Sequence, residues 1–204
     1  MPGLNRRSYA DAVEVLAAGD KDLARIVERF GAPSLVSRPS GFATLVSIIF
    51  EQQVSLASAK ATFDKVALLL PEFTEHRYLE LSDETLRTAG VSRQKIRYTR
   101  LVAEAILEGA LPIRSLARKS DAQVRELLTA ITGLGNWTAD VYLMIALRRP
   151  DLWPIGDLAL VKAVVSVKRL GDKPDAHTLE QLGERYRPYR SVATSIFWRH
   201  YLHS

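Results

Sequence analysis

Apolar residues recur at spacings of three and four along nearly the whole chain, and no segment alternates regularly between apolar and polar positions. Such spacing places apolar side chains on one face of an α-helix, whereas a half-buried strand needs a period of two. The pattern therefore predicts an all-α fold with short links. The expected helices cover residues 8–18, 20–30, 41–53, 55–70, 82–89, 92–109, 119–130, 137–148, 158–169, 177–186 and 191–202.

Several of these segments begin or end at residues that suit a helix terminus. Ser82, Ser92 and Ser191 each stand at the start of a periodic segment, where a side-chain oxygen can accept an unused backbone N–H. Gly90 follows one such segment, and glycine adopts a left-handed backbone at little cost. We expect the three serines to cap helices and Gly90 to end one.

Composition excludes several classes of protein. The 204 residues are 47% apolar and 25% charged, which is typical of a globular protein. The absence of cysteine excludes disulfides, thiolate zinc sites, iron–sulfur clusters and cysteine nucleophiles. No signal-peptide core and no run of 18 apolar residues is present, so we expect a cytoplasmic protein, nucleoid-associated in a bacterium or nuclear in a eukaryote. The net charge of +5 favours a polyanionic partner.

The segment ITGLGNWTAD, residues 131–140, has the pattern of a tight turn that leads into a helix. Gly133 and Gly135 can take positive φ, which lets the chain reverse within a few residues. The unused N–H groups at the start of the second helix, together with the helix dipole, suit a DNA phosphate. A plain connection between two core helices would use the same residues, and these residues alone leave both interpretations open.

Two stretches together resemble the helix-hairpin-helix (HhH-GPD) superfamily of DNA glycosylases. LLTAITGLGNWTAD is similar to the hairpin of that superfamily, and LWPIGDLALVKAV is similar to the segment that carries its catalytic aspartate. The 20 residues from Trp137 to Asp157 are the separation typical of the superfamily. LVSIIFEQQVSLASAKATF and RPYRSVATSIFWRHYL resemble the 3-methyladenine DNA glycosylase II branch. The resemblance covers most of the chain from about residue 40.

This resemblance implies a two-lobed helix-hairpin-helix DNA glycosylase fold with the active-site cleft between the lobes. The expected hairpin-containing lobe is 35–150, and the expected terminal lobe is 1–34 plus 151–204. The implied function is release of alkylated purines, such as 3-methyladenine and 7-methylpurines, from duplex DNA in base excision repair. A glycosylase for etheno or deaminated purines, or a non-catalytic DNA-binding module with this hairpin, remain the alternatives. We expect a monomer.

Asp157 is the candidate catalytic residue. Pro150, Pro154 and Gly156 can return the chain after the second hairpin helix, which brings this carboxylate back toward the hairpin. A fixed carboxylate stabilises the positive charge that develops on the sugar as the glycosidic bond breaks. The local sequence alone favours Asp157 as the cap of helix 158–169, and the two roles are compatible.

The residue at position 137 decides between two reaction types. Lyase members of the superfamily carry a lysine there, which forms a Schiff base with the sugar, and an indole cannot act as that nucleophile. We therefore expect a monofunctional glycosylase. Trp137 would instead offer an aromatic face to a cationic alkylated base that has been flipped from the duplex. A tryptophan that merely seals two helices is the alternative.

The other expected walls of the base pocket are Trp198 and Tyr142. The resemblance matches Trp198 to a second aromatic wall, although a core position fits its local sequence nearly as well. Val141 and Leu158 stand where the best-known bacterial pattern has aromatic residues. Tyr142 could substitute for them only if its helix is rotated.

The segment EQQVS, residues 51–55, supplies the expected wedge. Gln53 falls where relatives insert a side chain into the gap left by the flipped base, and an exposed turn between helices is the alternative. Most of the clustered and scattered basic residues are expected to be solvated, and these residues are Arg93, Lys95, Arg97, Arg100, Lys119, Lys162 and Lys168. The expected DNA contacts in full are Gln52, Gln53, Gly133, Gly135, Asn136, Thr138 and Lys162.

No cofactor is expected to be required. His200 and His203 lack a third ligand and make a poor zinc site. The resemblance implies that a Na⁺ or K⁺ ion could bind the backbone carbonyls of Thr129, Ile131 and Leu134.

Overall fold

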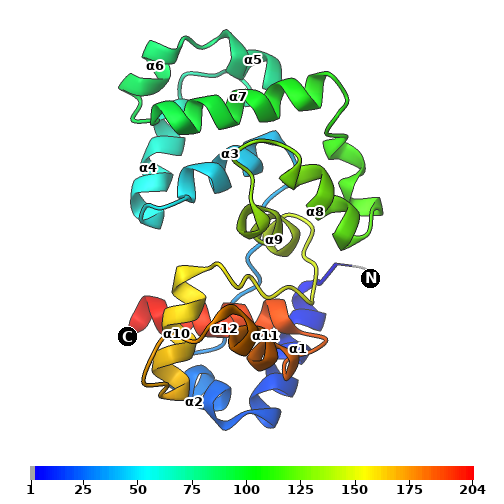
Figure 1. Cartoon of the computed structure of the whole chain (residues 1–204), viewed down its shortest axis with the longest axis vertical. Coiled ribbons are helices and arrows are strands. Elements are labelled where there is room, and N and C mark those ends of the chain that lie inside the picture. Colours follow the sequence, from blue (N-terminus) through cyan, green and yellow to red (C-terminus); the bar gives the residue numbers. More distant parts are fainter. Residues whose placement is uncertain (1–2) are drawn as a thin grey trace. The chain divides into compact units, whose positions relative to one another are not determined.

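The computed structural model describes residues 3–204, and within that range it contains helices and no strand (Figure 1). The all-α prediction is confirmed, and every expected helix is present. Two short elements were not expected, α5 (Glu75–Glu80) and the 3₁₀ helix η1 (Ile113–Arg118), because six residues show little helical period. Helix α6 is equally short, but Ser82 and Gly90 mark its two ends in the sequence. The other helices are α1 (Arg6–Gly19), α2 (Lys21–Phe30), α3 (Phe42–Glu51), α4 (Leu56–Ala67), α6 (Asp83–Thr88), α7 (Arg93–Leu107), α8 (Asp121–Thr129), α9 (Asn136–Ile145), α10 (Leu158–Lys168), α11 (Ala176–Glu184) and α12 (Arg190–His203).

Three of the four expected helix-terminal residues act as predicted. The hydroxyls of Ser82 and Ser92 accept N–H groups from the first turns of α6 and α7, and Gly90 has a φ of +101° after α6. The expected cap at Ser191 is wrong. Helix α12 begins one residue earlier, and Ser191 Oγ instead accepts the Leu152 N–H at 2.9 Å. Ser191 therefore joins the segment before α10 to α12.

Residues 3–37 and 143–204 form one compact unit by their contacts. Helix α12 packs against α10, α2 and α1. The core of this unit contains Leu23, Leu160 and Phe197, none of which is exposed. The Trp153 ring lies 5.9 Å from that of Phe197, and its indole N–H donates to Leu179 O at 2.9 Å. The two ends of the chain thus share one core.

Residues 38–142 form the second compact unit. Helix α3 packs against α4 and α7, and α5 and α6 also pack against α7. Leu45, Ile48 and Val102 are fully buried in this unit. Residues 143–150, which we expected to group with the hairpin, group with the terminal helices, where the Leu4 N–H donates to Arg148 O at 2.8 Å.

Within residues 3–204, no helix combines the length and the apolar character that crossing a membrane requires.

Candidate active site

Asp157 forms the N-cap of α10. Its Oδ1 atom accepts the Leu160 N–H at 2.7 Å, and the Asp157 N–H itself donates to Pro154 O at 2.8 Å. The residue is only 7% exposed. The capping role predicted from the sequence is therefore present, and the carboxylate is held in a fixed position at the start of the helix.

Trp198 supplies a second donor to the same oxygen atom. Its indole Nε1 donates to Asp157 Oδ1 at 2.9 Å, across 41 residues of sequence. Two N–H groups from two helices thus converge on Oδ1, which fixes the direction of the carboxyl group as well as its position. The sequence alone gave no sign of this bond. The nearest signal is an indole on the edge of the apolar face of α12, because a partly buried indole N–H usually finds an acceptor.

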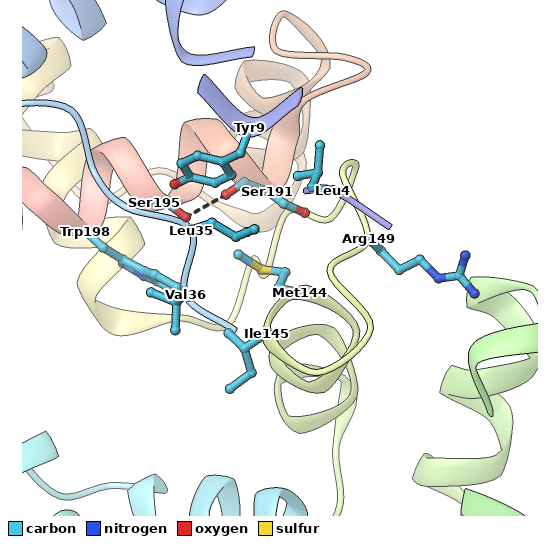
Figure 2. A pocket seen from close by; sticks show the side chains of 10 residues that line it. All are labelled: Leu4, Tyr9, Leu35, Val36, Met144, Ile145, Arg149, Ser191, Ser195 and Trp198. Carbon is cyan, nitrogen blue, oxygen red and sulfur yellow. Dashed lines mark hydrogen bonds between the residues drawn. The ribbon is translucent and has the colours of Figure 1, made fainter. Parts of the chain in front are cut away.

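The Trp198 side chain also lines a small pocket in the unit formed by the chain termini (Figure 2). Leu35 and Val36, which follow α2, and Met144 and Ile145 of α9 line it as well. Its cavity volume of about 20 Å³ suffices for one water molecule and is far too small for a purine. This pocket alone is therefore not the expected base pocket.

The hairpin between α8 and α9 has the tight turn that was predicted. Of its two glycines only Gly133 has a positive φ, at +95°. A Cβ atom on Gly133 would lie 2.2 Å from the ring of Tyr98, so the backbone packs directly on that aromatic face. Nothing in the sequence distinguishes Tyr98, because an aromatic residue on one face of a helix such as α7 usually packs in the core.

Gly135 serves a different purpose. It does not have a positive φ, and a Cβ atom added to it would meet no atom within 4 Å. Open space above this backbone, directly before Asn136 at the start of α9, leaves room for close approach of another molecule. The N–H groups in the first turn of a helix make such a position suitable for an anion.

An ion pair fastens the two helices of the hairpin to each other. Arg125 of α8 donates from Nε to Asp140 Oδ1 of α9 at 3.2 Å, and the Asp140 side chain is 11% exposed. The sequence pattern alone does not reveal this pair. The available signal was a single carboxylate inside the apolar run of α9, because a buried charge needs a partner.

The turn of residues 52–55, between α3 and α4, holds its two glutamines in different environments. Gln53 is exposed and has a φ of +58°, an uncommon conformation for a non-glycine residue. Gln52 Nε2 donates to Gly133 O at 3.1 Å and to Thr138 Oγ1 at 3.0 Å. Both amide protons of Gln52 are thus used inside the protein, and Thr138 is only 1% exposed. Contact of Gln52, Gln53 and Thr138 with DNA stays a prediction.

The aromatic residues expected to line the base pocket have different environments. Trp137 lies in the first turn of α9 and is partly buried. Tyr142 is fully buried, and burial raises the pKa of its hydroxyl to about 12, so its ring does not line an open pocket. Val141 is also buried, whereas Leu158 is 61% exposed. That Trp137 and Trp198 form two walls of one pocket stays a prediction.

The basic residues divide into structural and exposed groups. Lys95 Nζ donates to Phe50 O at 2.8 Å, and burial lowers its pKa. Arg100 donates to Leu81 O at 2.6 Å. Lys168 pairs with two aspartates of the N-terminal region. These three basic residues therefore have structural partners, whereas Lys162 on α10 is exposed.

The profile of the HhH-GPD superfamily of base excision DNA repair proteins matches residues 46–188. The chain belongs to the HhH-GPD superfamily. The matched segment contains both the hairpin and the Asp157 cap, so the two features described above belong to the part of the chain that carries the family pattern.

Relatives of this HhH-GPD protein include proteins named for alkylation repair. It is 28% identical to a putative DNA-3-methyladenine glycosylase of Bacillus subtilis over 87% of the chain, but spans only 64% of the relative's length. It is 27% identical to an alkylbase DNA glycosidase-like protein of Schizosaccharomyces pombe, over 94% of the chain and 93% of the relative.

Solved structures give the same fold. A 3-methyladenine DNA glycosylase of S. pombe in complex with abasic DNA superposes with a TM-score of 0.85 at 26% identity, covering 92% of this chain and 95% of that one. A DNA-3-methyladenine glycosidase of Bacillus halodurans superposes with a TM-score of 0.76 at 34% identity, covering 93% and 88%. The two-lobed glycosylase fold is therefore shared with enzymes of this name.

Proposed function

We propose that this HhH-GPD protein is a monofunctional DNA glycosylase that hydrolyses the N-glycosidic bond of alkylated purines in duplex DNA. The observation that carries the proposal is the Asp157 carboxylate, which two N–H donors hold on a rigid helix start. The names of the relatives from S. pombe, B. subtilis and B. halodurans support the substrate class. The whole reaction would occur in base excision repair.

In the proposed reaction the C1′–N bond of the damaged nucleotide breaks. A purine alkylated at N3 or N7 carries a positive charge, so it leaves as a neutral base when it takes the bonding electron pair. The sugar then bears the positive charge, which the fixed carboxylate of Asp157 stabilises. A water molecule adds its oxygen to C1′ and loses a proton, which leaves an abasic site.

The tryptophan at position 137 supports hydrolysis without strand cleavage. An indole cannot form the Schiff base through which a lysine would cleave the strand. The aromatic face of Trp137 would attract the cationic base, a contact worth about 0.5–2 kcal/mol. Most of the selectivity would then come from the greater reactivity of the alkylated base as a leaving group.

The hairpin would bind a DNA phosphate through the N–H groups at the start of α9. The open backbone at Gly135 would allow close approach, and exposed Asn136 and Lys162 would add contacts. A Na⁺ or K⁺ ion could also bind the carbonyls of Thr129, Ile131 and Leu134. The Ile131 carbonyl accepts the Leu134 N–H at 3.1 Å and keeps a second lone pair for such an ion.

The deciding experiment is release of free base from methylated duplex DNA. Wild type is expected to release 3-methyladenine or 7-methylguanine and to leave an intact strand until alkali is added. Asp157→Asn should release base about 10²–10³ times more slowly. A circular dichroism spectrum and a melting curve establish that the variant is folded.

Other results would point to the alternatives. Strand cleavage without alkali would contradict the monofunctional assignment. Release from etheno or deaminated purines alone would move the substrate to another lesion. DNA binding that Asp157→Asn leaves unchanged, with no base released from any substrate of the panel, would indicate a binding module.

A further inference from the structure

The turn of residues 52–55, called the wedge turn here, is joined to the hairpin by one side chain. Gln52 Nε2 lies 3.1 Å from Gly133 O and 3.0 Å from Thr138 Oγ1. These partners follow Gln52 by 81 and 86 residues. Gly133 is the tight point of the hairpin and Thr138 lies in the first turn of α9, so a single amide group spans the hairpin.

The chemistry of these atoms fixes which end of the Gln52 amide faces the hairpin. A carbonyl oxygen only accepts hydrogen bonds, so the group beside Gly133 O must be the NH₂ group. That group has two protons, one for each acceptor. Thr138 is 1% exposed, so one bond lies away from solvent, where a lost partner costs more than at the surface.

The residue next to Gln52 has the least favourable backbone of the wedge turn. Gln53 has a φ of +58°, and such a left-handed residue persists when its surroundings hold it in place. On one side, the Phe50 carbonyl accepts from Lys95 Nζ at 2.8 Å. On the other side, Ser55 Oγ accepts the Ser58 N–H at 3.2 Å and caps α4. Gln52 is the anchor that reaches the hairpin.

We infer that Gln52 is a positioning residue that ties the wedge turn to the hairpin. Its amide protons serve this tie rather than DNA, which revises its expected role. The tie joins the wedge turn to the hairpin, so that the two form one rigid body. The wedge turn presents Gln53, and the hairpin would bind a phosphate. A bound phosphate therefore sets the depth at which Gln53 enters the duplex. The roles of these two ends rest on the proposed function, whereas the tie is a property of the free protein.

Four variants separate the tie from general effects of substitution. Gln52→Met removes both donors and keeps a side chain of similar length. Thr138→Val removes one acceptor and keeps the shape, whereas Thr138→Ser keeps the acceptor. Gln181→Met makes the same glutamine change on α11, where Gln181 is exposed and bonds only locally, to His177.

The first measurement is amide hydrogen exchange of the free protein, which needs no substrate. In Gln52→Met, exchange of residues 52–55 and 131–138 should be about three- to tenfold faster, the range expected for loss of one or two hydrogen bonds. Thr138→Val should raise exchange in the same two segments. The double variant Gln52→Met/Thr138→Val should exchange only slightly faster than Gln52→Met alone. Thr138→Ser and Gln181→Met should leave the wedge turn as in wild type.

The second measurement tests the consequence for DNA. The probe is a duplex with a tetrahydrofuran abasic site opposite 2-aminopurine, whose fluorescence rises when the base is unstacked. Gln52→Met should reduce this rise about three- to tenfold at saturating protein. Its affinity for undamaged duplex, measured at the same salt concentration, should stay within about twofold of wild type, because the N–H groups at the start of α9 remain in place.

The outcomes are distinguishable from failure of the proposed function. Unchanged exchange in Gln52→Met overturns the tie. A parallel loss of melting temperature, undamaged-duplex affinity and fluorescence also overturns it, because the role would then be structural only. If wild type releases no base yet both segments exchange faster in Gln52→Met, the tie stands and the enzymatic proposal fails.

Discussion

The indole N–H of Trp198 donates to Oδ1 of Asp157 at 2.9 Å, and the same oxygen accepts the Leu160 N–H at 2.7 Å. The carboxylate is therefore directed by one backbone and one side-chain donor. A ring that lines a neighbouring pocket thus also orients the candidate catalytic group. In a site of this kind the position of the charge matters as much as its presence.

Replacing Trp198 by phenylalanine should separate these two roles. Trp198→Phe keeps an aromatic face but loses the N–H, and a hydrogen bond to a charged group is worth about 1.5–3 kcal/mol. Because the Leu160 N–H still holds Asp157, we expect single-turnover base release to fall about tenfold, less than in Asp157→Asn. Trp153→Phe is the matched control, since its N–H donates to Leu179 O and not to Asp157. Wild-type rates in Trp198→Phe would contradict the positioning role.

Alanine substitution of the two hairpin glycines should affect different properties, stability at Gly133 and DNA binding at Gly135. Gly133→Ala combines a φ of +95° with a Cβ 2.2 Å from the Tyr98 ring, so we expect a loss of more than about 1 kcal/mol in the free energy of unfolding. Gly135→Ala meets open space and should leave that free energy within about 0.5 kcal/mol. It should nevertheless weaken duplex binding if a phosphate approaches there. Urea unfolding and fluorescence anisotropy measure the two effects, and equal destabilisation of both variants would refute this division.

The ion pair of the hairpin should contribute measurably to stability. Asp140→Asn leaves Arg125 without its charged partner, and we expect a loss of about 1–3 kcal/mol in the free energy of unfolding. The control is Asp64→Asn, which breaks an exposed pair with Lys60 on α4 and should cost less than about 0.5 kcal/mol. Chemical denaturation of the three proteins tests this difference. Similar midpoints for both variants would contradict it.

The pairing of Lys168 with Asp20 and Asp22 should make stability depend on pH. Burial would raise the pKa of Asp20, but hydrogen bonds from Lys168, the Asp22 N–H and Tyr186 outweigh it and lower the pKa. The pKa of Asp22 is lowered mainly by its hydrogen bond from Lys168. Groups with a lowered folded-state pKa stabilise the fold above their unfolded pKa of about 3.9 and lose that contribution as pH falls through the folded value.

Melting temperature measured from pH 6 down to pH 2 should therefore fall, and Lys168→Met should flatten the fall. The pKa of Lys168 is raised, because its hydrogen bonds to the aspartates outweigh burial. Its contribution is thus complete below the unfolded lysine pKa of about 10.4 and is lost only as pH rises above the folded value. If melting temperature falls with the same slope below pH 4 in wild type and in Lys168→Met, the pairing of Lys168 with Asp20 and Asp22 does not control acid stability.

Much of this molecule follows from local sequence. Helical periodicity predicts the long helices because each turn of a half-buried helix places apolar residues on the same face. Ser82, Ser92 and Asp157 are recognisable as caps because a cap depends only on the capping residue and the next few residues. The tight turn at Gly133 is local in the same sense. The short α5 was not predicted because it contains too few turns to show an apolar face, whereas the equally short α6 was predicted from Ser82 and Gly90 at its ends.

Only the tertiary structure decided which groups meet. The sequence could name Trp198 and Asp157, but not the bond between them, and it could name Gln52, but not its partners in the hairpin. It also placed Ser191 at a helix start, whereas its hydroxyl accepts the Leu152 N–H. Helix formation is set by near neighbours along the chain. Hydrogen bonds between distant segments depend on how packed helices orient each side chain, and that orientation exists only in the folded core.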